Sequence, residues 1–291
     1  MNRVLNIKAF AFAALLLISV PRVVLAHGEL LIRIAAITRQ IQAATNNPAA
    51  LYLQRGELHR EHRDWPAAAS DYDSAARFDP GLFAVDSCRA TMLADAGILD
   101  DAIGLFDKAI ARSPSEGSLY LGRARVLANL GRCDAAIADF RKGLNLLPEP
   151  KPEYFHELAE TQVANAQTNL ALLSLDEGIR RFGPILLLQA YALDLELRSG
   201  NNEAALVRLD TILPAAPRKE NWFARRGDIL LALDRPDEAR IAYEAALKAI
   251  EILPPPLQRG PPIQKLRARV NIALTGINVP TLTKLVGKTT P

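Results

Sequence analysis

The sequence contains few aromatic residues and lacks the short motifs that mark common catalytic sites. Aromatic residues make up 6% of the 291 residues and hydrophobic residues 49%, so the apolar content is chiefly alanine, leucine and isoleucine. These residues allow helices to pack closely, which predicts an all-α protein. No glycine-rich phosphate loop, nucleophile elbow or zinc-ligand cluster occurs. We therefore predict no catalytic residue, no metal site and no cofactor, and a protein that is not an enzyme.

The sequence also lacks an excess of positive charge once its first residues are set aside. Arg3, Lys8 and Arg22 belong to the 35 basic residues, and without these three, 32 bases face 32 acids. A neutral chain predicts no binding to nucleic acid. Beyond Glu251 there is no acid but there are six bases. We interpret this stretch as a solubilising basic end, with a patch for an acidic partner or a membrane surface as the alternative.

The N-terminus is typical of a secretory signal peptide over residues 1–26. A short basic segment precedes the apolar run Ala9–Val20, and small residues end at Ala26. A run of about twelve residues is shorter than the roughly twenty that span a bilayer. The sequence thus predicts export to the periplasm or secretion, with no stable membrane insertion after cleavage. Cleavage would give His27 a free α-amine, and an amine with an imidazole chelates copper. An accessory subunit of an envelope metal or phosphate system is therefore the alternative function.

One unit of sequence recurs along most of the chain. Alanines recur at intervals of 34, 34, 35, 34 and 34 residues, namely Ala68, Ala102, Ala136, Ala171, Ala205 and Ala239. Four residues after each alanine stands a larger side chain, namely Tyr72, Phe106, Phe140, Leu175, Leu209 and Tyr243. This spacing puts both on one face of a helix. A second helical stripe precedes each alanine, and glycines such as Gly97, Gly131 and Gly200 separate the two. Each unit is therefore predicted to be a helical hairpin.

This pattern resembles the tetratricopeptide repeat, in six copies over residues 49–251. Segments such as Leu99-Asp100-Asp101-Ala102-Ile103 carry the resemblance. It implies an α-solenoid of helical hairpins, a right-handed superhelix that binds an unidentified protein or peptide as a non-catalytic scaffold or adaptor. Because a hairpin cannot bury both of its faces, we predict capping helices within 27–48 and, after a stiff proline-rich strap, within 252–276. The tail over 277–291 is predicted to be disordered.

The resemblance also implies which residues line a concave groove on the first helices of the repeats. Positions 2, 5, 9 and 12 of the repeat form this groove in the family. The corresponding candidates are Leu53, Glu57, Arg60, Ser87, Thr91, Leu121, Arg125, His156, Glu160, Asp194, Asn221 and Asp228. The Lys and Asn residues with which one branch of the family clamps a terminal carboxylate are absent at these positions.

Histidines and cysteines are scarce and carry no clear site. His59 and His62 are three residues apart beside Glu61, but His59 falls on the packing stripe, so we interpret it as a packed histidine and not a ligand. Cys88 and Cys133 are the only thiols. They occupy repeat positions separated by roughly 16 Å along the helix axes, beyond the reach of a disulfide. We therefore predict two unpaired thiols.

Overall fold

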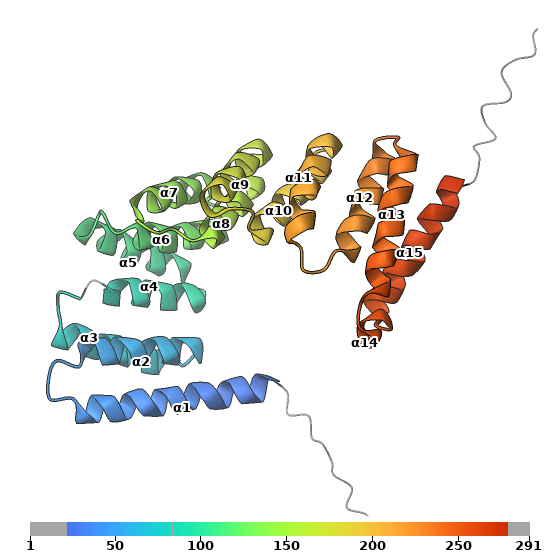
Figure 1. The fold of residues 1–291 in the computed structure, drawn as a ribbon. Helices are drawn as coiled ribbons and strands as arrows, with labels where there is room; N and C mark the ends of the chain where they lie inside the picture. The colour runs from blue at the N-terminus through green and yellow to red at the C-terminus, as the bar shows by residue number, and fades with distance from the viewer. Residues whose placement is uncertain (1–21, 83, 279–291) are drawn as a thin grey trace, which may run out of the picture. The chain divides into compact units, whose positions relative to one another are not determined.

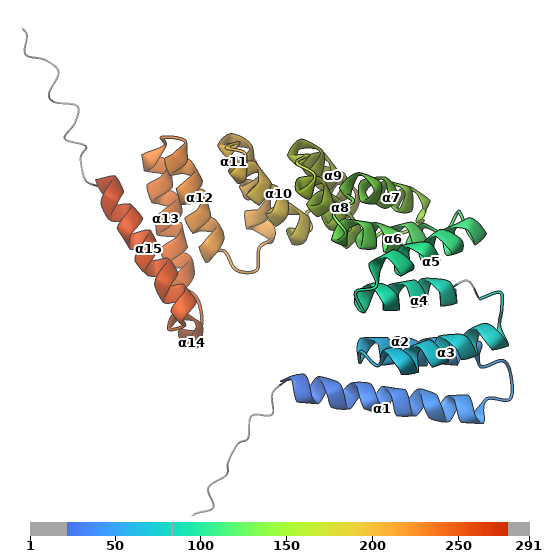
Figure 2. The same ribbon diagram turned by 180° about the vertical axis from the view of Figure 1, so that it is seen from behind.

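The computed structural model describes residues 22–82 and 84–278, and all regular secondary structure in these ranges is helical. Fifteen helices occur in this part of the chain, and they fall into two compact units, Met1–Pro114 and Ser115–Pro291. Helical hairpins stack on one another within each unit (Figures 1 and 2). The predicted all-α architecture of stacked hairpins is confirmed.

The first unit consists of one long helix and two hairpins. Helix α1 (Arg22–Ala43) packs against α2 (Ala49–Glu61), which pairs with α3 (Trp65–Phe78). Helix α4 (Ala84–Asp95) follows and pairs with α5 (Leu99–Arg112). Trp65 begins α3 after Asp64, whose side chain accepts a hydrogen bond from the amide of Ala67 and so caps the helix.

The second unit begins with four hairpins. These are α6 (Gly117–Asn129) with α7 (Cys133–Leu146), α8 (Pro152–Ala164) with α9 (Thr168–Phe182), α10 (Leu186–Arg198) with α11 (Asn202–Ala215), and α12 (Glu220–Ala232) with α13 (Pro236–Glu251). Two further helices end the described chain, namely α14 (Pro255–Gln258) and α15 (Pro261–Asn278). Helix α15 packs against both α12 and α13.

Small residues at fixed places let the two helices of each hairpin approach closely. All six recurrent alanines are 0% exposed, and the larger side chains four residues later are at most 1% exposed. Gly56 and Gly227 lie opposite two of these larger residues. A Cβ on Gly56 would stand 2.6 Å from the Tyr72 ring, and one on Gly227 would stand 2.5 Å from the Tyr243 ring. The sequence period therefore marks the buried seam of each hairpin.

The turn inside each hairpin uses one left-handed residue at the same place in all six. Counting each repeat so that its recurrent alanine is the twentieth residue, this residue is the fifteenth. Three are the predicted glycines, with φ of 81°, 72° and 74° at Gly97, Gly131 and Gly200. The other three are Arg63, Ala166 and Asp234, with φ of 61°, 56° and 56°. The stacking of the helices therefore imposes the turn even where no glycine favours it.

The two ends of the described chain differ from expectation in detail. Helix α1 begins at Arg22, earlier than the predicted capping helix within 27–48, because no proline lies between the two starts. Residues 1–21 of the predicted signal peptide lie outside the described ranges. At the other end, α15 continues to Asn278 because Ile277 packs against the core, so the predicted start of a tail at 277 is wrong. The rest of that predicted tail, residues 279–291, is also outside the described ranges.

The predicted extended strap is wrong as well. Within it, residues Pro255–Gln258 form the short helix α14, and α15 starts directly afterwards at Pro261. Proline lacks an amide hydrogen, but the first turn of a helix needs none there, so consecutive prolines start helices here instead of extending the chain.

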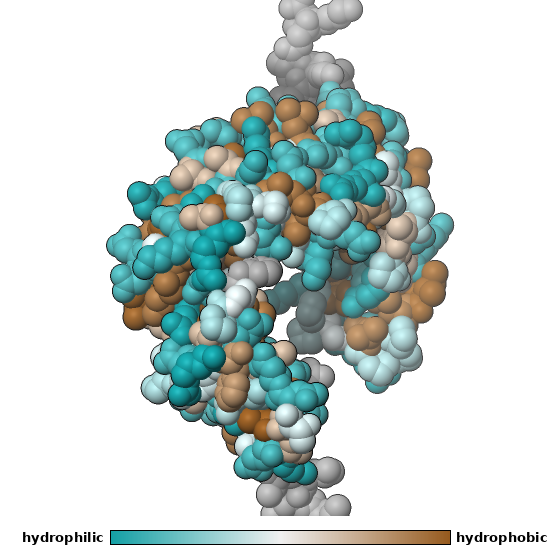
Figure 3. All heavy atoms as spheres, turned by 90° about the vertical axis from the view of Figure 1, so that its left-hand side faces the viewer, coloured by the Kyte–Doolittle hydropathy of each residue, from teal (hydrophilic) through white to brown (hydrophobic). Residues whose placement is uncertain are grey.

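One face of the molecule carries a mixture of hydrophilic and hydrophobic residues. Figure 3 shows hydrophobic residues scattered among hydrophilic ones, without one continuous hydrophobic area on that face. Within residues 22–82 and 84–278, no helix combines the length and the hydrophobicity that crossing a bilayer requires.

Candidate functional site

The first helices of neighbouring hairpins contact each other through a repeated pair of positions. The side chain at position 9 of one repeat meets the side chain at position 6 of the next. In the first unit Glu57 meets Cys88, and in the second unit Arg125 meets Glu157 and Asp194 meets Arg225. We call these the 9–6 contacts. They identify the surface of the first helices, where the groove residues were predicted, as one continuous row within each unit.

In the first unit, the charged side chains of this row pair with one another. Arg60 on α2 forms ion pairs with Glu57 on the same helix and with Asp95 on α4. Tyr72 on α3 donates a hydrogen bond of 2.5 Å to Glu57. Burial opposes the charge of Arg60, but the hydrogen bonds with Glu57 and Asp95 outweigh it and raise its pKa. Each charged group here already has a partner within the protein.

Burial in this network also suppresses the acidity of two side chains. It raises the pKa of the Tyr72 hydroxyl, and the bond to Glu57 raises it further. Burial, together with the nearby Glu57 carboxylate, raises the pKa of the Cys88 thiol to about 12. Both groups therefore stay protonated near neutral pH and act as donors toward Glu57.

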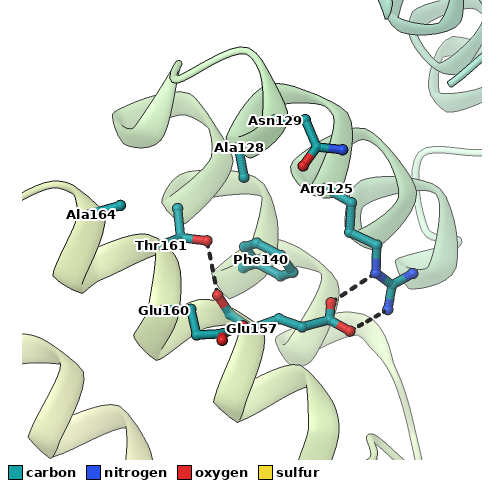
Figure 4. A pocket seen from close by; sticks show the side chains of 8 residues that line it. All are labelled: Arg125, Ala128, Asn129, Phe140, Glu157, Glu160, Thr161 and Ala164. Atoms are coloured by element: carbon teal, nitrogen blue, oxygen red, sulfur yellow. Dashed lines mark hydrogen bonds and ion pairs between the residues drawn. The ribbon is translucent and has the colours of Figure 1, made fainter. Parts of the chain in front are cut away.

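In the second unit, Arg125 on α6 binds Glu157 on α8 in a two-pronged ion pair. Its Nε and Nη2 donate to the carboxylate at 2.7 and 3.1 Å. The guanidinium also lies over the ring of Tyr154, 5.5 Å from its centre. The ion pair joins the two first helices at one side of a hollow (Figure 4).

This hollow is a pocket of about 270 Å³ between α6, α7 and α8. Ala128, Ala164 and the ring of Phe140 provide its apolar lining. Its polar lining consists of Arg125, Asn129, Glu157, Glu160 and Thr161. Thr161 is 5% exposed and donates its hydroxyl to the carbonyl oxygen of Glu157, so its oxygen retains accepting capacity. The pocket therefore combines an apolar floor with a rim rich in acceptors.

Glu160, in the lining of the pocket, occupies position 9 of its repeat and lies near Tyr191 of α10. The Glu160 side chain is 56% exposed, and His156 lies 3.4 Å from it. The ring of His156 also contacts that of Tyr191, with 4.7 Å between centres. Burial raises the pKa of Tyr191, and the negative charge of Glu160 adds to this shift.

At the far end of the second unit, the charged side chains of the row are again paired. Asp194 pairs with Arg225 of α12. Asp228 accepts 2.7 Å from the hydroxyl of Tyr243 and 2.6 Å from Arg269 of α15. Arg269 thus takes the place that position 6 of a following repeat would occupy. The terminal helix α15 covers the side of the last hairpin, which is the contact expected of a cap.

The structure places all twelve predicted groove residues on the first helices, but it corrects one of them. Leu121 is 2% exposed, because its side chain packs against Gly143 of α7, so it belongs to the core and not to a groove. Leu53 is half-buried against the core of the first unit. Ser87 and Thr91 are half-buried on α4, where the Thr91 hydroxyl donates to the Ser87 carbonyl. Asn221 is exposed on α12.

Sequence reasoning missed Glu157, Tyr191 and Arg225, which all occupy position 6. The signal that identifies them is their register: each lies 31 or 32 residues after a position 9 residue of the preceding repeat. Tyr154 and Thr161 were missed as well. Neither belongs to the four positions from which the groove was predicted.

The scarce histidines and cysteines take part in other contacts. Ring nitrogens of His59 lie 3.9 Å from carboxylates of Asp64 and Asp71, and the ring is largely buried. In the described ranges, no three His, Cys, Asp or Glu side chains gather as metal ligands would. Cys88 and Cys133 are free thiols, both half-buried. The side chain of His27, on which the metal alternative depends, lies outside what the structure describes.

Two family models match the sequence. A tetratricopeptide repeat-like domain matches residues 155–253, and a tetratricopeptide repeat matches residues 89–149, which together exceed half of the chain. The chain is therefore a tetratricopeptide repeat protein. Proteins of this family mediate the binding of proteins and peptides and are typically not catalytic. No curated protein matches the sequence.

Solved structures with the same fold include three with low sequence identity. A TPR repeat-containing protein from Cytophaga hutchinsonii has a TM-score of 0.59 at 15% identity, covering 84% of this chain and 97% of that one. The pilF protein of Pseudomonas aeruginosa has a TM-score of 0.53 at 15% identity, covering 76% and 97%. YrrB, a TPR protein with an unusual peptide-binding site, has a TM-score of 0.50 at 17% identity, covering 69% and 97%. These likenesses concern the fold alone.

Proposed function

We propose that this chain is a non-catalytic adaptor of the cell envelope that binds a protein or peptide on the surface of its first helices. The observation that supports this most strongly is the pocket between α6 and α8, which is bordered by the predicted groove residues Arg125 and Glu160. A surface that is both polar and recessed, on a rigid helical frame, suits the capture of a partner's side chain.

Export is the second part of the proposal, and it rests on the basic start, the apolar run and the small residues up to Ala26. Cleavage after Ala26 leaves the contacts of α1 with α2 intact, since Ile37 is buried and Thr38 accepts a hydrogen bond from Arg55 at 3.1 Å. We expect the chain in the envelope fraction, with an intact mass that corresponds to a start at His27. A chain that keeps residues 1–26 in the cytosolic fraction would contradict export.

Affinity capture with two matched variants tests the binding surface. The first variant, Leu187→Lys with Asn221→Glu, changes two exposed side chains on first helices. The control variant, Leu173→Lys with Ile241→Glu, makes the same kind of change on second helices, where these side chains are 63% and 65% exposed. Neither pair fills a core site, so both variants should fold like the parent, which circular dichroism can verify.

We expect a partner that the parent and the control variant retain and that the first variant loses at least tenfold. The partner is then identified by mass spectrometry and its binding measured again with purified components. If the control variant loses the partner and the first variant keeps it, the second helices form the working surface and the proposal is wrong.

A further inference from the structure

The carboxylates along the row of first helices differ in how the protein neutralises them. Three acids at position 9 have close partners: Glu57 pairs with Arg60 and Tyr72. Asp194 pairs with Arg225, and Asp228 contacts Tyr243 and Arg269. In each case a fixed cation or a hydroxyl group on a neighbouring helix offsets the negative charge.

Glu160 lacks both kinds of partner among the described residues, and the sequence explains why. A tyrosine at position 24 supplies the hydroxyl in the first and last repeats, but in this repeat that position is Leu175. An arginine at position 6 of the next repeat supplies the cation for Asp194, but opposite Glu160 that position is Tyr191. The nearest ionisable partner is His156 at 3.4 Å, which carries a charge only when it is protonated.

Glu160 also borders the pocket of about 270 Å³ between α6, α7 and α8. Its apolar lining, Ala128, Phe140 and Ala164, matches a hydrocarbon stem, and its rim carries the carboxylates of Glu157 and Glu160. Lysine and arginine have this composition, because an aliphatic stem carries a charged end. The rings of His156 and Tyr191 stand beside Glu160 but do not belong to the lining of the pocket.

An acidic ligand fits the pocket poorly. Arg125 is the one basic side chain in its lining, and its charge is already offset by Glu157, to which two of its three guanidinium nitrogens donate at 2.7 and 3.1 Å. An incoming carboxylate would meet a guanidinium that Glu157 already neutralises, and it would approach the carboxylates of Glu157 and Glu160 as a like charge. The electrostatics of the pocket therefore favour a cation over an anion.

We propose that the pocket between α6 and α8 binds a lysine or arginine side chain of a partner peptide, with the stem against Ala128 and Ala164 beside the Phe140 ring and the charged end on Glu160. Asn129 and Thr161 supply further hydrogen-bond acceptors for the cation. This inference rests on the proposed function, because it names the chemical class of partner that the first-helix surface selects.

The test titrates the whole, isotopically labelled chain with capped pentapeptides that differ only at the central residue. The central residue is lysine, arginine, norleucine or glutamate, and both peptide ends are blocked so that no terminal charge contributes. We expect amide chemical shifts to change in residues 125–129 and 157–164 with the lysine and arginine peptides. The norleucine and glutamate peptides should bind at least tenfold more weakly.

A matched pair of variants assigns the effect to Glu160. Glu160→Gln should weaken binding of the lysine peptide about tenfold. Glu153→Gln removes the same charge from another exposed site on α8, outside the pocket lining, and should change binding less than twofold. Raising the salt concentration should weaken binding to the parent chain and have little effect on the Glu160→Gln variant.

The inference is overturned if lysine binds no better than norleucine, if no peptide binds, or if both variants weaken binding equally. These outcomes are separate from failure of the proposed function. If a captured partner is lost with the first-helix variant but still binds the Glu160→Gln variant, the adaptor function is supported and binding of a basic residue in the pocket is refuted. If the lysine peptide binds but no partner is captured, binding of a basic residue is supported and the adaptor function is not.

Discussion

The first-helix surfaces of unit 1 and unit 2 are built from the same repeat positions, but the side chains there make different contacts. In unit 1, Arg60 forms ion pairs with Glu57 and Asp95, and the Tyr72 hydroxyl donates a further hydrogen bond to Glu57. In unit 2, Arg125 takes the position of Glu57, and its pairing with Glu157 leaves the Glu160 carboxylate beside an open pocket. The comparison teaches that a repeat fixes where side chains meet, while the residue types decide whether the meeting place is closed or open to a partner.

The largest expected effect concerns the thiol in the closed network. With Cys133→Ser in place, Cys88 is the only thiol, and its pKa is raised to about 12. We expect iodoacetamide to alkylate it at pH 8 at least about a hundredfold more slowly in the folded chain than in urea, because the thiolate is the reactive form. Rates within tenfold of each other would contradict the buried, closed network.

The same shift has a pH consequence for stability. Because the folded thiol keeps its proton up to about pH 12 and the unfolded thiol releases it from its ordinary value of 9.0, unfolding is accompanied by proton release above that value. The contribution of Cys88 to the free energy of unfolding is therefore fully present below pH 9 and is lost as the pH rises from 9 towards 12. Urea unfolding at pH 8 and pH 10.5 should therefore show the lower free energy of unfolding at pH 10.5.

The second prediction concerns the seam beneath the closed network. Gly56→Ala should lower the free energy of unfolding by about 2 kcal/mol, because the new methyl group meets the Tyr72 ring at 2.6 Å. Adding Tyr72→Phe to this variant should recover part of the loss, because without the hydroxyl the ring is no longer held by Glu57 and can shift. An alanine and a phenylalanine already occupy these two positions in another repeat, as Ala124 and Phe140. Urea denaturation of the single and double variants measures both effects.

A glycine without neighbours provides the control. Gly104 on α5 has no atom within 4 Å of where a Cβ would stand apart from its chain neighbours and the local backbone of its own helix, so Gly104→Ala should stabilise the chain by up to about 1 kcal/mol. If Gly56→Ala stabilised the chain equally, the close approach of α2 and α3 would not be real.

The third prediction converts the open site into a closed one. Ala159→Gly with Leu175→Tyr introduces into the repeat of Glu160 the glycine and tyrosine that accompany Glu57 in unit 1. The new hydroxyl should bind Glu160, and affinity for the lysine pentapeptide should fall about tenfold, measured by the same titration. The control is Leu175→Phe with Ala159→Gly, which adds a ring without a hydroxyl and should retain more of the affinity.

The smallest effect is expected from the ion pair at the side of the pocket. The side chains of Arg125 and Glu157 are 46% and 29% exposed, so Arg125→Gln should cost less than about 1 kcal/mol in the free energy of unfolding. Arg208, by contrast, is 13% exposed and pairs with the buried Glu196, so Arg208→Gln should cost several times more. Equal losses in urea denaturation would show that the pocket pair is buried more deeply than the structure indicates.

The hairpins were predictable because their cause is local and repeated. Ala68 and the five alanines that follow it recur with one period, and each is completely buried because only a small residue fits the seam. The pocket was only partly predictable. Arg125 and Glu160 were found from their repeat positions, but Leu121 lies at position 5 like other candidates and is nevertheless buried against Gly143. Whether a surface position is exposed depends on its neighbour across the seam.

The sequence by itself determined the helical class, the period of the hairpins and their buried faces, because small and large residues at fixed spacing leave few other ways to pack. The tertiary structure alone decided which charges meet. The contacts between Arg125 and Glu157, and between Asp228 and Arg269, join residues 32 and 41 positions apart. Such pairs depend on the register between neighbouring helices, which the packing of whole hairpins sets, so the open carboxylate of Glu160 became visible only in three dimensions.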